Sequence, residues 1–254
     1  MTTTIPCKIF LLGGHDLEML TIKQLLDGRV GCVVMDKNLR WDNAHLSAYQ
    51  DSLALYPDGD IYGIELQEDV SVPANYHRID HHNDYALKPS ALEQVAEMMG
   101  VALNRYQQLV AANDKGYIPS MQALSATDEE IADIRRRDRE AQGVSEADEQ
   151  MAELSVKDHF SRHGSLWVVR SLTPRFSPIC DRLYPFQRLL IYTDSEWVFY
   201  GEGKAELVDL LVEDIKQKKI YHGGGDEGYV GAARWAYSQG EIIEFVEFIK
   251  RQYE

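Results

Sequence analysis

The feature that most constrains the fold is an alternation, early in the chain, between short apolar runs and stretches with helical spacing. Four runs predict strands, at Lys8–Leu12, Cys32–Met35, Ile61–Leu66 and Tyr76–Ile79. Between the first two, apolar residues recur at helical spacing from Leu17 to Leu26. Strands that alternate with helices are joined by crossover connections. The sequence therefore predicts an α/β fold with a Rossmann-like, mostly parallel sheet.

The pattern changes twice further along. From Ser90, which forms a capping box with Glu93, the spacing is helical, and it remains so through a highly charged stretch. Strand signals return after Gly164, at Leu166–Val169, Arg188–Tyr192 and Glu196–Tyr200. We therefore expect an α/β domain over residues 1–120, a helical connector over 121–163 and a smaller C-terminal α/β domain over 164–254.

Charge and composition limit the classes of function. The 254 residues include 26 Lys and Arg against 41 Asp and Glu, a formal net charge of −15. This balance argues against a protein that grips long nucleic acid through many phosphate contacts. The cluster Arg135, Arg136, Arg137 and Arg139 is interleaved with acids, so local ion pairs are the preferred interpretation. No apolar run is long enough for a membrane span, and three scattered cysteines fit a reducing, cytoplasmic compartment.

The strongest local signal is Asp80-His81-His82, directly after the fourth predicted strand. Open α/β sheets bind ligands at the carboxyl ends of their strands. Other acids and a histidine are expected at the same edge: His15, Asp16 and Glu18 after the first strand, Asp36 after the second, Glu65 at the end of the third, and Asp114 at a helix end. Imidazole and carboxylate ligands suit Mn²⁺, and carboxylates suit Mg²⁺. The alternative is an ordinary surface histidine pair, with the acids serving as caps and turn residues.

With these residues the sequence resembles the DHH family of metal-dependent phosphoesterases. Asp80-His81-His82 matches the motif that names the family. The resemblance implies that His81 is a metal ligand, that His82 faces the metal or a substrate phosphate, that Glu65 takes the place of a bridging Asp, and that Asp114 is a late metal-binding Asp. It also implies a C-terminal domain in which His222, Gly223, Gly224 and Gly225 bind substrate. Read alone, the glycine run is either an anion-binding nest or a flexible turn.

The resemblance fails at the front of the chain. The family's first motif has aspartates four and six residues after a His, and here those positions hold Met19 and Thr21. The available ligands are instead His15, Asp16 and Glu18. Glu65 also carries one more methylene than an Asp, a shift of about 1.5 Å in its carboxylate. These departures leave one metal, two metals or no catalysis as open outcomes.

The leading hypothesis is metal-dependent hydrolysis of a small phosphoester or phosphoanhydride. Mn²⁺ or Mg²⁺ would be held by His81, Glu65, Asp114 and some of His15, Asp16, Glu18 and Asp36, with His82 and Asp80 as catalytic residues. The expected partner is a small phosphorylated substrate, not long nucleic acid or a membrane, with a homodimer left open. The alternatives are a non-catalytic DHH-like nucleotide sensor or scaffold with an eroded metal site, and an unrelated α/β hydrolase with a coincidental His pair.

Overall fold

The computed structural model describes residues 8–224 and 228–253. The chain divides into two compact units, Met1–Gly143 and Val144–Glu254. The division falls inside the stretch expected to be a separate connector. Helix α5 (Asp128–Ala141) packs on α1 and α4 in the first unit, and α6 (Glu146–His159) packs on α7 and β6 in the second. The charged stretch therefore supplies a packed helix to each unit.

The first unit contains a four-stranded sheet in which every pair of neighbouring strands is parallel. Its strands are β1 (Lys8–Leu12), β2 (Cys32–Met35), β3 (Asp60–Ile64) and β4 (Tyr76–Ile79), and their order is β2-β1-β3-β4. The central strand β1 is almost wholly buried. The predicted Rossmann-like parallel sheet is thus confirmed, because the four apolar runs form these strands almost residue for residue.

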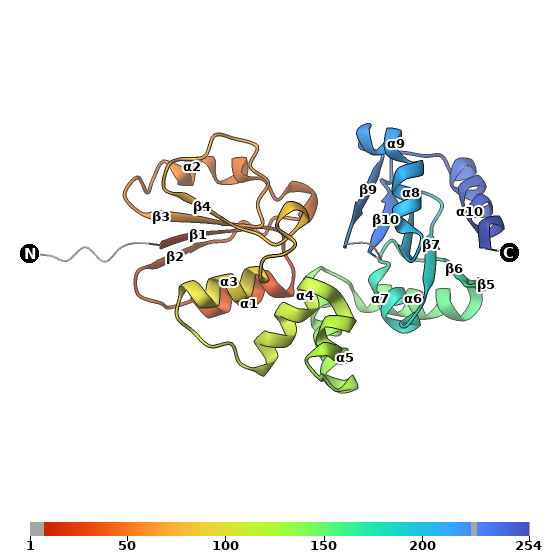
Figure 1. Cartoon of the computed structure of the whole chain (residues 1–254), viewed down its shortest axis with the longest axis horizontal. Coiled ribbons are helices and arrows are strands. Elements are labelled where there is room, and N and C mark those ends of the chain that lie inside the picture. Colours follow the sequence, from red (N-terminus) through yellow and green to blue (C-terminus); the bar gives the residue numbers. More distant parts are fainter. Residues whose placement is uncertain (1–7, 225–227, 254) are drawn as a thin grey trace, which may run out of the picture. The chain divides into compact units, whose positions relative to one another are not determined.

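Helices cover both faces of this sheet. Helices α1 (Leu17–Leu26) and α3 (Ala91–Met98) lie on one side, and the short α2 (Gln50–Leu53) lies on the other (Figure 1). Helix α4 (Arg105–Ala123) packs against α1 and α3. The core beneath α2 includes Ile9, Leu11, Leu46, Tyr49 and Ile61. From Ile9 onward, successive side chains of β1 point to opposite faces of the sheet, and on both faces they are apolar and buried. The polar residues therefore lie in the loops at the strand ends.

The second unit is built around a six-stranded mixed sheet. Its strand order is β5-β6-β7-β8-β10-β9, and only β6 and β7 are parallel neighbours among the described strands. The strands are β5 (Phe160–His163), β6 (Leu166–Arg170), β7 (Arg188–Tyr192), β8 (Trp197–Gly201), β9 (Ile220–Gly223) and β10 (Tyr229–Ala232). One core cluster lies on each face of the sheet. The expected C-terminal α/β unit is therefore present, with more strands than the sequence pattern indicated.

Helices α6 to α10 accompany this second sheet. In chain order after α6 they are α7 (Ser177–Leu183), α8 (Lys204–Leu210), α9 (Val212–Lys216) and α10 (Gln239–Tyr253). Residues of α6 and α7 enter the core of one face, and residues of α8 and α10 enter the core of the other. The helical stretch between β8 and β9 is interrupted at Leu211, which separates α8 from α9. Within the described ranges, no helix has both the length and the hydropathy that crossing a bilayer requires.

Candidate metal centre

The site begins where β3 and β4 end side by side. Ile64 and Ile79 are register partners in this parallel pair, and the chain leaves β3 into Glu65 and β4 into Asp80-His81-His82. Glu65 has a φ of +51°, in the left-handed region that non-glycine residues rarely adopt, and its N–H donates to Ile79 O at 2.8 Å. Such strained backbone is found preferentially at functional sites. The predicted convergence at the carboxyl edge of the sheet is what the topology produces.

A glycine lets the first strand's loop approach this edge closely. A Cβ built on Gly13 would lie 2.6 Å from Glu65 O, a distance that real Cβ atoms do not show. Any other residue at position 13 would push Glu65 away from the loop that leads into α1. The Gly13-Gly14 pair is therefore explained by packing at the site, in addition to its role as a turn.

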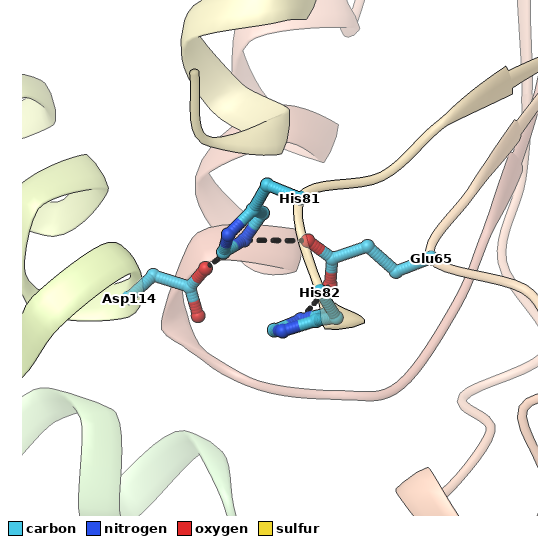
Figure 2. A group of neighbouring side chains, drawn as sticks. All are labelled: Glu65, His81, His82 and Asp114. Carbon is cyan, nitrogen blue, oxygen red and sulfur yellow. Dashed lines mark ion pairs between the residues drawn. The ribbon is translucent and has the colours of Figure 1, made fainter. Parts of the chain in front are cut away.

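Four side chains meet at this edge, and they come from three segments of the chain. Glu65, His81, His82 and Asp114 each offer one ligand atom, and these atoms all lie within 4.8 Å of one another. His81 Nε2 is 3.0 Å from Glu65 Oε1 and 2.5 Å from Asp114 Oδ2, and His82 Nε2 is 3.6 Å from Glu65 Oε2. Figure 2 shows the His81 ring between the two carboxylates, with His82 beside Glu65. This arrangement has the donor types and the spacing of a metal centre.

Two more carboxylates border the cluster from the start of α1. Glu18 Oε2 lies 3.7 Å from His81 Nε2, while Glu18 Oε1 accepts a hydrogen bond from Leu92 N. Asp16 is the N-cap of α1, where its Oδ1 accepts from Met19 N at 2.8 Å. Both residues are at most 3% exposed. The first loop therefore delivers acids to the site even though Met19 and Thr21 stand at the two aspartate positions of the family's motif.

The cluster holds more negative charge than its own side chains neutralise. Four buried or largely buried carboxylates, those of Asp16, Glu18, Glu65 and Asp114, face two imidazoles, so protonating both histidines leaves a net charge of −2. Within the described residues, six buried atoms of the cluster lie in ion-pair contact but make no well-aligned hydrogen bond: Glu18 Oε2, both Glu65 carboxylate oxygens, His81 Nε2, His82 Nε2 and Asp114 Oδ2. Buried polar atoms are normally satisfied. Their inward convergence fits a divalent cation, which would supply both charge and ligand bonds.

Titration behaviour of the acids reflects the same imbalance. Burial, together with the charges of Asp114 and Glu65, holds the pKa of Asp16 well above its ordinary value. Burial and the nearby Glu18 raise the pKa of Asp114 to about 6. Burial also raises the pKa of Glu18. Each shift says that a negative charge is unfavourable here in the absence of a cation.

The histidines respond in the opposite direction. Burial lowers the pKa of His81, but the carboxylates of Asp114, Glu18 and Glu65 outweigh it and raise that pKa to about 12. For His82, burial is likewise outweighed by Glu65, and the pKa rises. Without a metal, therefore, the carboxylates favour the protonated form of both imidazoles.

Three other predicted site residues of the first unit, Asp36, His15 and Asp80, lie outside both the four-residue group and the bordering acids Asp16 and Glu18. Asp36 is engaged elsewhere, since its Oδ2 is 2.8 Å from Lys23 Nζ and its Oδ1 accepts from Asn38 N. The backbone N–H of His15 donates to Leu39 O, and His15 lies near Asp36. Asp80 Oδ1 accepts from His82 N at 2.9 Å, so it holds the backbone of the His-His pair. Ligand roles for His15 and Asp36, and a catalytic role for Asp80, stay predictions.

The predicted substrate-binding residues belong to the second unit. His222 and Gly223 end β9, and Gly224 follows with a φ of +73°. Gly225 lies outside the described residues. The run precedes strand β10 and not a helix, since Gly223 pairs with Tyr229 in an antiparallel ladder. His222 and Gly223 thus belong to a β-hairpin, and the role of the glycine run in binding substrate stays a prediction.

Sequence reasoning missed a buried polar network behind the cluster. Arg135 Nη1 donates to Asn113 Oδ1 at 2.9 Å and to Asp138 Oδ2 at 2.8 Å, and Asp138 Oδ1 accepts from Leu17 N at 3.4 Å. All three polar side chains belong to residues less than 9% exposed. Asn113 precedes the candidate ligand Asp114, and Leu17 lies between Asp16 and Glu18. The network therefore ties together the two helices that carry three acids of the site.

The neighbouring arginines behave as the sequence suggested. Arg136 pairs with Asp133 and Glu140, and Arg137 pairs with Asp133, all on the exposed side of α5. Arg135 differs from them because it points to the buried side of α5, since the side chains of adjacent helix residues point about 100° apart. The apolar positions Ile131 and Ile134, which are buried, mark the phase of the inner face. That spacing is the signal by which Arg135 could have been assigned to the interior.

Comparison with known proteins was made by sequence and by structure. No family model matches the chain, and no curated protein matches it in sequence. Among solved structures, the DHH domain of a member of the s1p family of ribosomal proteins has a TM-score of 0.60 at 10% identity, over 98% of this chain and 87% of that one. At this identity the likeness concerns the fold.

Two further similar structures have lower scores. One is PggH, a pGpG-specific phosphodiesterase from Vibrio cholerae, with a TM-score of 0.49 and 13% identity over 98% of this chain and 99% of that one. The other is RecJ in complex with Mn²⁺ from Thermus thermophilus, with a TM-score of 0.43 and 9% identity over 97% of this chain and 52% of that one. The parallel sheet, the Asp80-His81-His82 edge and the structural likeness at TM-score 0.60 agree: the chain has the fold of DHH-domain proteins.

Proposed function

We propose that this protein is a metal-dependent phosphoesterase that hydrolyses a small phosphorylated substrate. The observation that carries the proposal is the buried meeting of Glu65, His81, His82 and Asp114, with surplus carboxylates and unsatisfied ligand atoms around them. A net negative charge buried without a cation is costly. The DHH family that the sequence resembles uses such a centre for phosphoester hydrolysis, and the chain shares the fold of DHH-domain proteins.

The position of each residue in the cluster indicates its role in the proposed metal centre. His81, Glu65 and Asp114 are the proposed ligands, because His81 Nε2 lies 3.0 Å from Glu65 Oε1 and 2.5 Å from Asp114 Oδ2. Glu18 and Asp16 are close enough to complete the set or to neutralise a second ion. Mixed imidazole and carboxylate donors favour Mn²⁺, with Mg²⁺ as the alternative. Thr21 cannot contribute, since its hydroxyl donates to Leu17 O inside α1.

His82 is the proposed proton carrier. Its side chain is 40% exposed, whereas that of His81 is 3% exposed, so His82 alone of the pair can reach both substrate and solvent. Glu65 raises the pKa of His82, which keeps a proton available on the ring. The protonated ring can stabilise a transferring phosphoryl group or protonate the leaving oxygen. Asp80 Oδ1 accepts from the backbone N–H of His82, which positions the backbone that carries this ring.

A bound divalent cation would supply Lewis acidity toward the phosphoryl oxygens and a water of lowered pKa. The chain's part is to exclude bulk water from the ligands and to keep the carboxylates ionised around the ion. Glu65 is well suited to this, because both of its oxygens are buried and face a different histidine each. The strained backbone at Glu65 is compatible with the longer Glu side chain at a position where the family has Asp.

The test combines metal binding with turnover. Titration calorimetry with Mn²⁺ should show binding to the wild-type protein, and bis(p-nitrophenyl) phosphate or pyrophosphate should be hydrolysed only with metal present. Glu65→Gln and His81→Ala should reduce Mn²⁺ affinity by at least about 100-fold, the upper range for losing even an outer-shell partner. The matched control is His77→Ala: His77 faces Asp60 at 3.4 Å at the other end of the same strands, so its removal should change neither quantity.

One other class of function has an observation in its favour. Met19 and Thr21 are buried within α1 and supply no ligand where the family's first motif has aspartates, which is what a nucleotide sensor or scaffold with an eroded site would show. Tight nucleotide binding without Mn²⁺ binding and without turnover of either substrate would support that function and contradict hydrolysis.

A further inference from the structure

The loop after β2 places an aromatic ring beside the candidate metal centre. Trp41 begins a short 3-10 helix, Trp41–Asn43, and its ring meets the His82 ring edge-on at 5.6 Å between centroids. His82 in turn lies 3.6 Å from Glu65. Trp41 is therefore one side chain away from the proposed ligands, although nothing in its immediate sequence marked it as a site residue.

The position of Trp41 is fixed by backbone contacts. Gly14 and Leu39 form a parallel bridge, and His15 N donates to Leu39 O at 2.8 Å. Asn43 Oδ1 then accepts from Arg40 N at 2.8 Å and closes the turn. The loop is thus fastened to the same Gly-Gly turn that borders Glu65. The backbone that carries Trp41 is positioned before any ligand arrives, which lowers the entropy cost of stacking against its ring.

One side of the ring rests on Gly14. A Cβ built on that glycine would lie 2.7 Å from Trp41 Cε2, so only glycine leaves room for the indole here. Even so, Trp41 is 44% exposed, which is unusual for so large an apolar side chain when it is packed against backbone on one side. The Trp41 ring thus packs on Gly14, is partly open to solvent and lies beside the candidate metal centre at His82. These are the features of a ring on which a nucleotide base can stack.

We propose that Trp41, supported by Gly14, is a stacking subsite for the base of a nucleotide whose phosphate reaches the centre at His82 and Glu65. The inference rests on the proposed function and narrows it: the substrate carries a planar ring, as a nucleotide or short oligonucleotide does and pyrophosphate does not. Stacking is tolerant of base identity, because every base presents a π-face. The subsite therefore selects nucleotides as a class.

The test uses two ligands that differ only in the base. AMP and ribose 5-phosphate are titrated calorimetrically into the Mn²⁺-loaded protein. The wild type should bind AMP about 5- to 150-fold more tightly, the range for stacking one base on an aromatic side chain. Trp41→Leu, which keeps an apolar cover over Gly14, should abolish the preference, and Trp41→Phe should retain most of it. Trp235→Leu is the control, since Trp235 is 69% exposed and belongs to the second unit.

Fluorescence gives a readout that does not depend on a variant's folding. AMP should quench part of the tryptophan emission of the wild type and ribose 5-phosphate should not, and the quenching should disappear in Trp41→Phe while the affinity for AMP persists. Equal affinity for the two ligands, or an AMP preference unchanged in Trp41→Leu, would overturn the subsite even with Mn²⁺ bound. A preference that persists in a protein that binds no Mn²⁺ would uphold the subsite and remove the proposed function.

Discussion

Two groups of buried charges lie in the first unit, and they differ in whether hydrogen bonds satisfy them. In the network of Arg135, Asp138 and Asn113, opposite charges meet at 2.8 Å and directed donors reach each acceptor. In the cluster around His81, carboxylates crowd together, and six atoms contact one another without a well-aligned hydrogen bond among the described residues. The first group is satisfied by its own hydrogen bonds, whereas the second keeps more carboxylates than its two imidazoles can neutralise. Burial of charge does not by itself indicate a ligand site; a surplus of one sign of charge among possible ligand atoms favours one.

The largest loss of stability should come from removing Arg135 from its network with Asp138 and Asn113. Arg135→Met removes the cation from Asp138 and leaves a buried carboxylate unpaired, which typically costs about 3–5 kcal/mol. Urea unfolding at neutral pH should show a loss of this size. Arg136→Met is the control on the same helix, where an exposed pair is lost and the change should stay below about 1 kcal/mol. Equal losses from the two substitutions would erase the distinction between the two kinds of arginine.

The next effect comes from filling the incomplete cluster. Mn²⁺ at a free concentration a hundred times its Kd should stabilise the wild type by about 2.7 kcal/mol, because only the folded state holds the ligands together. Thermal unfolding with Mn²⁺ and with EDTA measures this difference. Asp114→Asn should remove most of it, and Asp36→Asn should leave it unchanged, since Asp36 is occupied by Lys23 and Asn38. Loss of the Mn²⁺ effect in Asp36→Asn would instead place Asp36 in the centre.

Matched substitutions in the two groups should then change stability in opposite directions. In EDTA, Glu18→Gln should stabilise the protein, because it removes a negative charge that burial and the neighbouring Glu65 make unfavourable, while Leu92 N keeps its acceptor. Asp138→Asn should destabilise it, because Arg135 loses its counter-ion. Thermal unfolding of each variant in EDTA, compared with the wild type, measures the two changes in stability. A destabilised Glu18→Gln protein would mean that the cluster is already satisfied.

The same contrast explains what the sequence could and could not predict. The strands and the meeting of Glu65 with His81 followed from short apolar runs and from the rule that parallel strands end at one edge. The partners of Arg135 and Asp138, and the setting of Trp41, did not follow, because they depend on contacts between distant segments, such as Leu17 N with Asp138, 121 residues apart. The β9–β10 hairpin was hidden by glycines, which have low strand propensity. Local patterns predicted which candidate ligands meet, whereas the residues around them required the fold.

The smallest effect concerns an ion pair in solvent, which extends the comparison to the surface. Arg105 and Glu130 form a bidentate pair, and Arg105, with a hydrogen bond from Thr127 N, lowers the pKa of Glu130 to about 2. A carboxyl group with a lowered folded-state pKa stabilises the protein above its unfolded value of 4.5 and loses that contribution as the pH falls toward 2. Glu130→Gln should therefore be slightly less stable than the wild type at pH 6, with the gap narrowing at pH 3 and in high salt. Urea unfolding at both pH values measures the gap; a gap that widens in acid would show that Glu130 acts through something other than its charge.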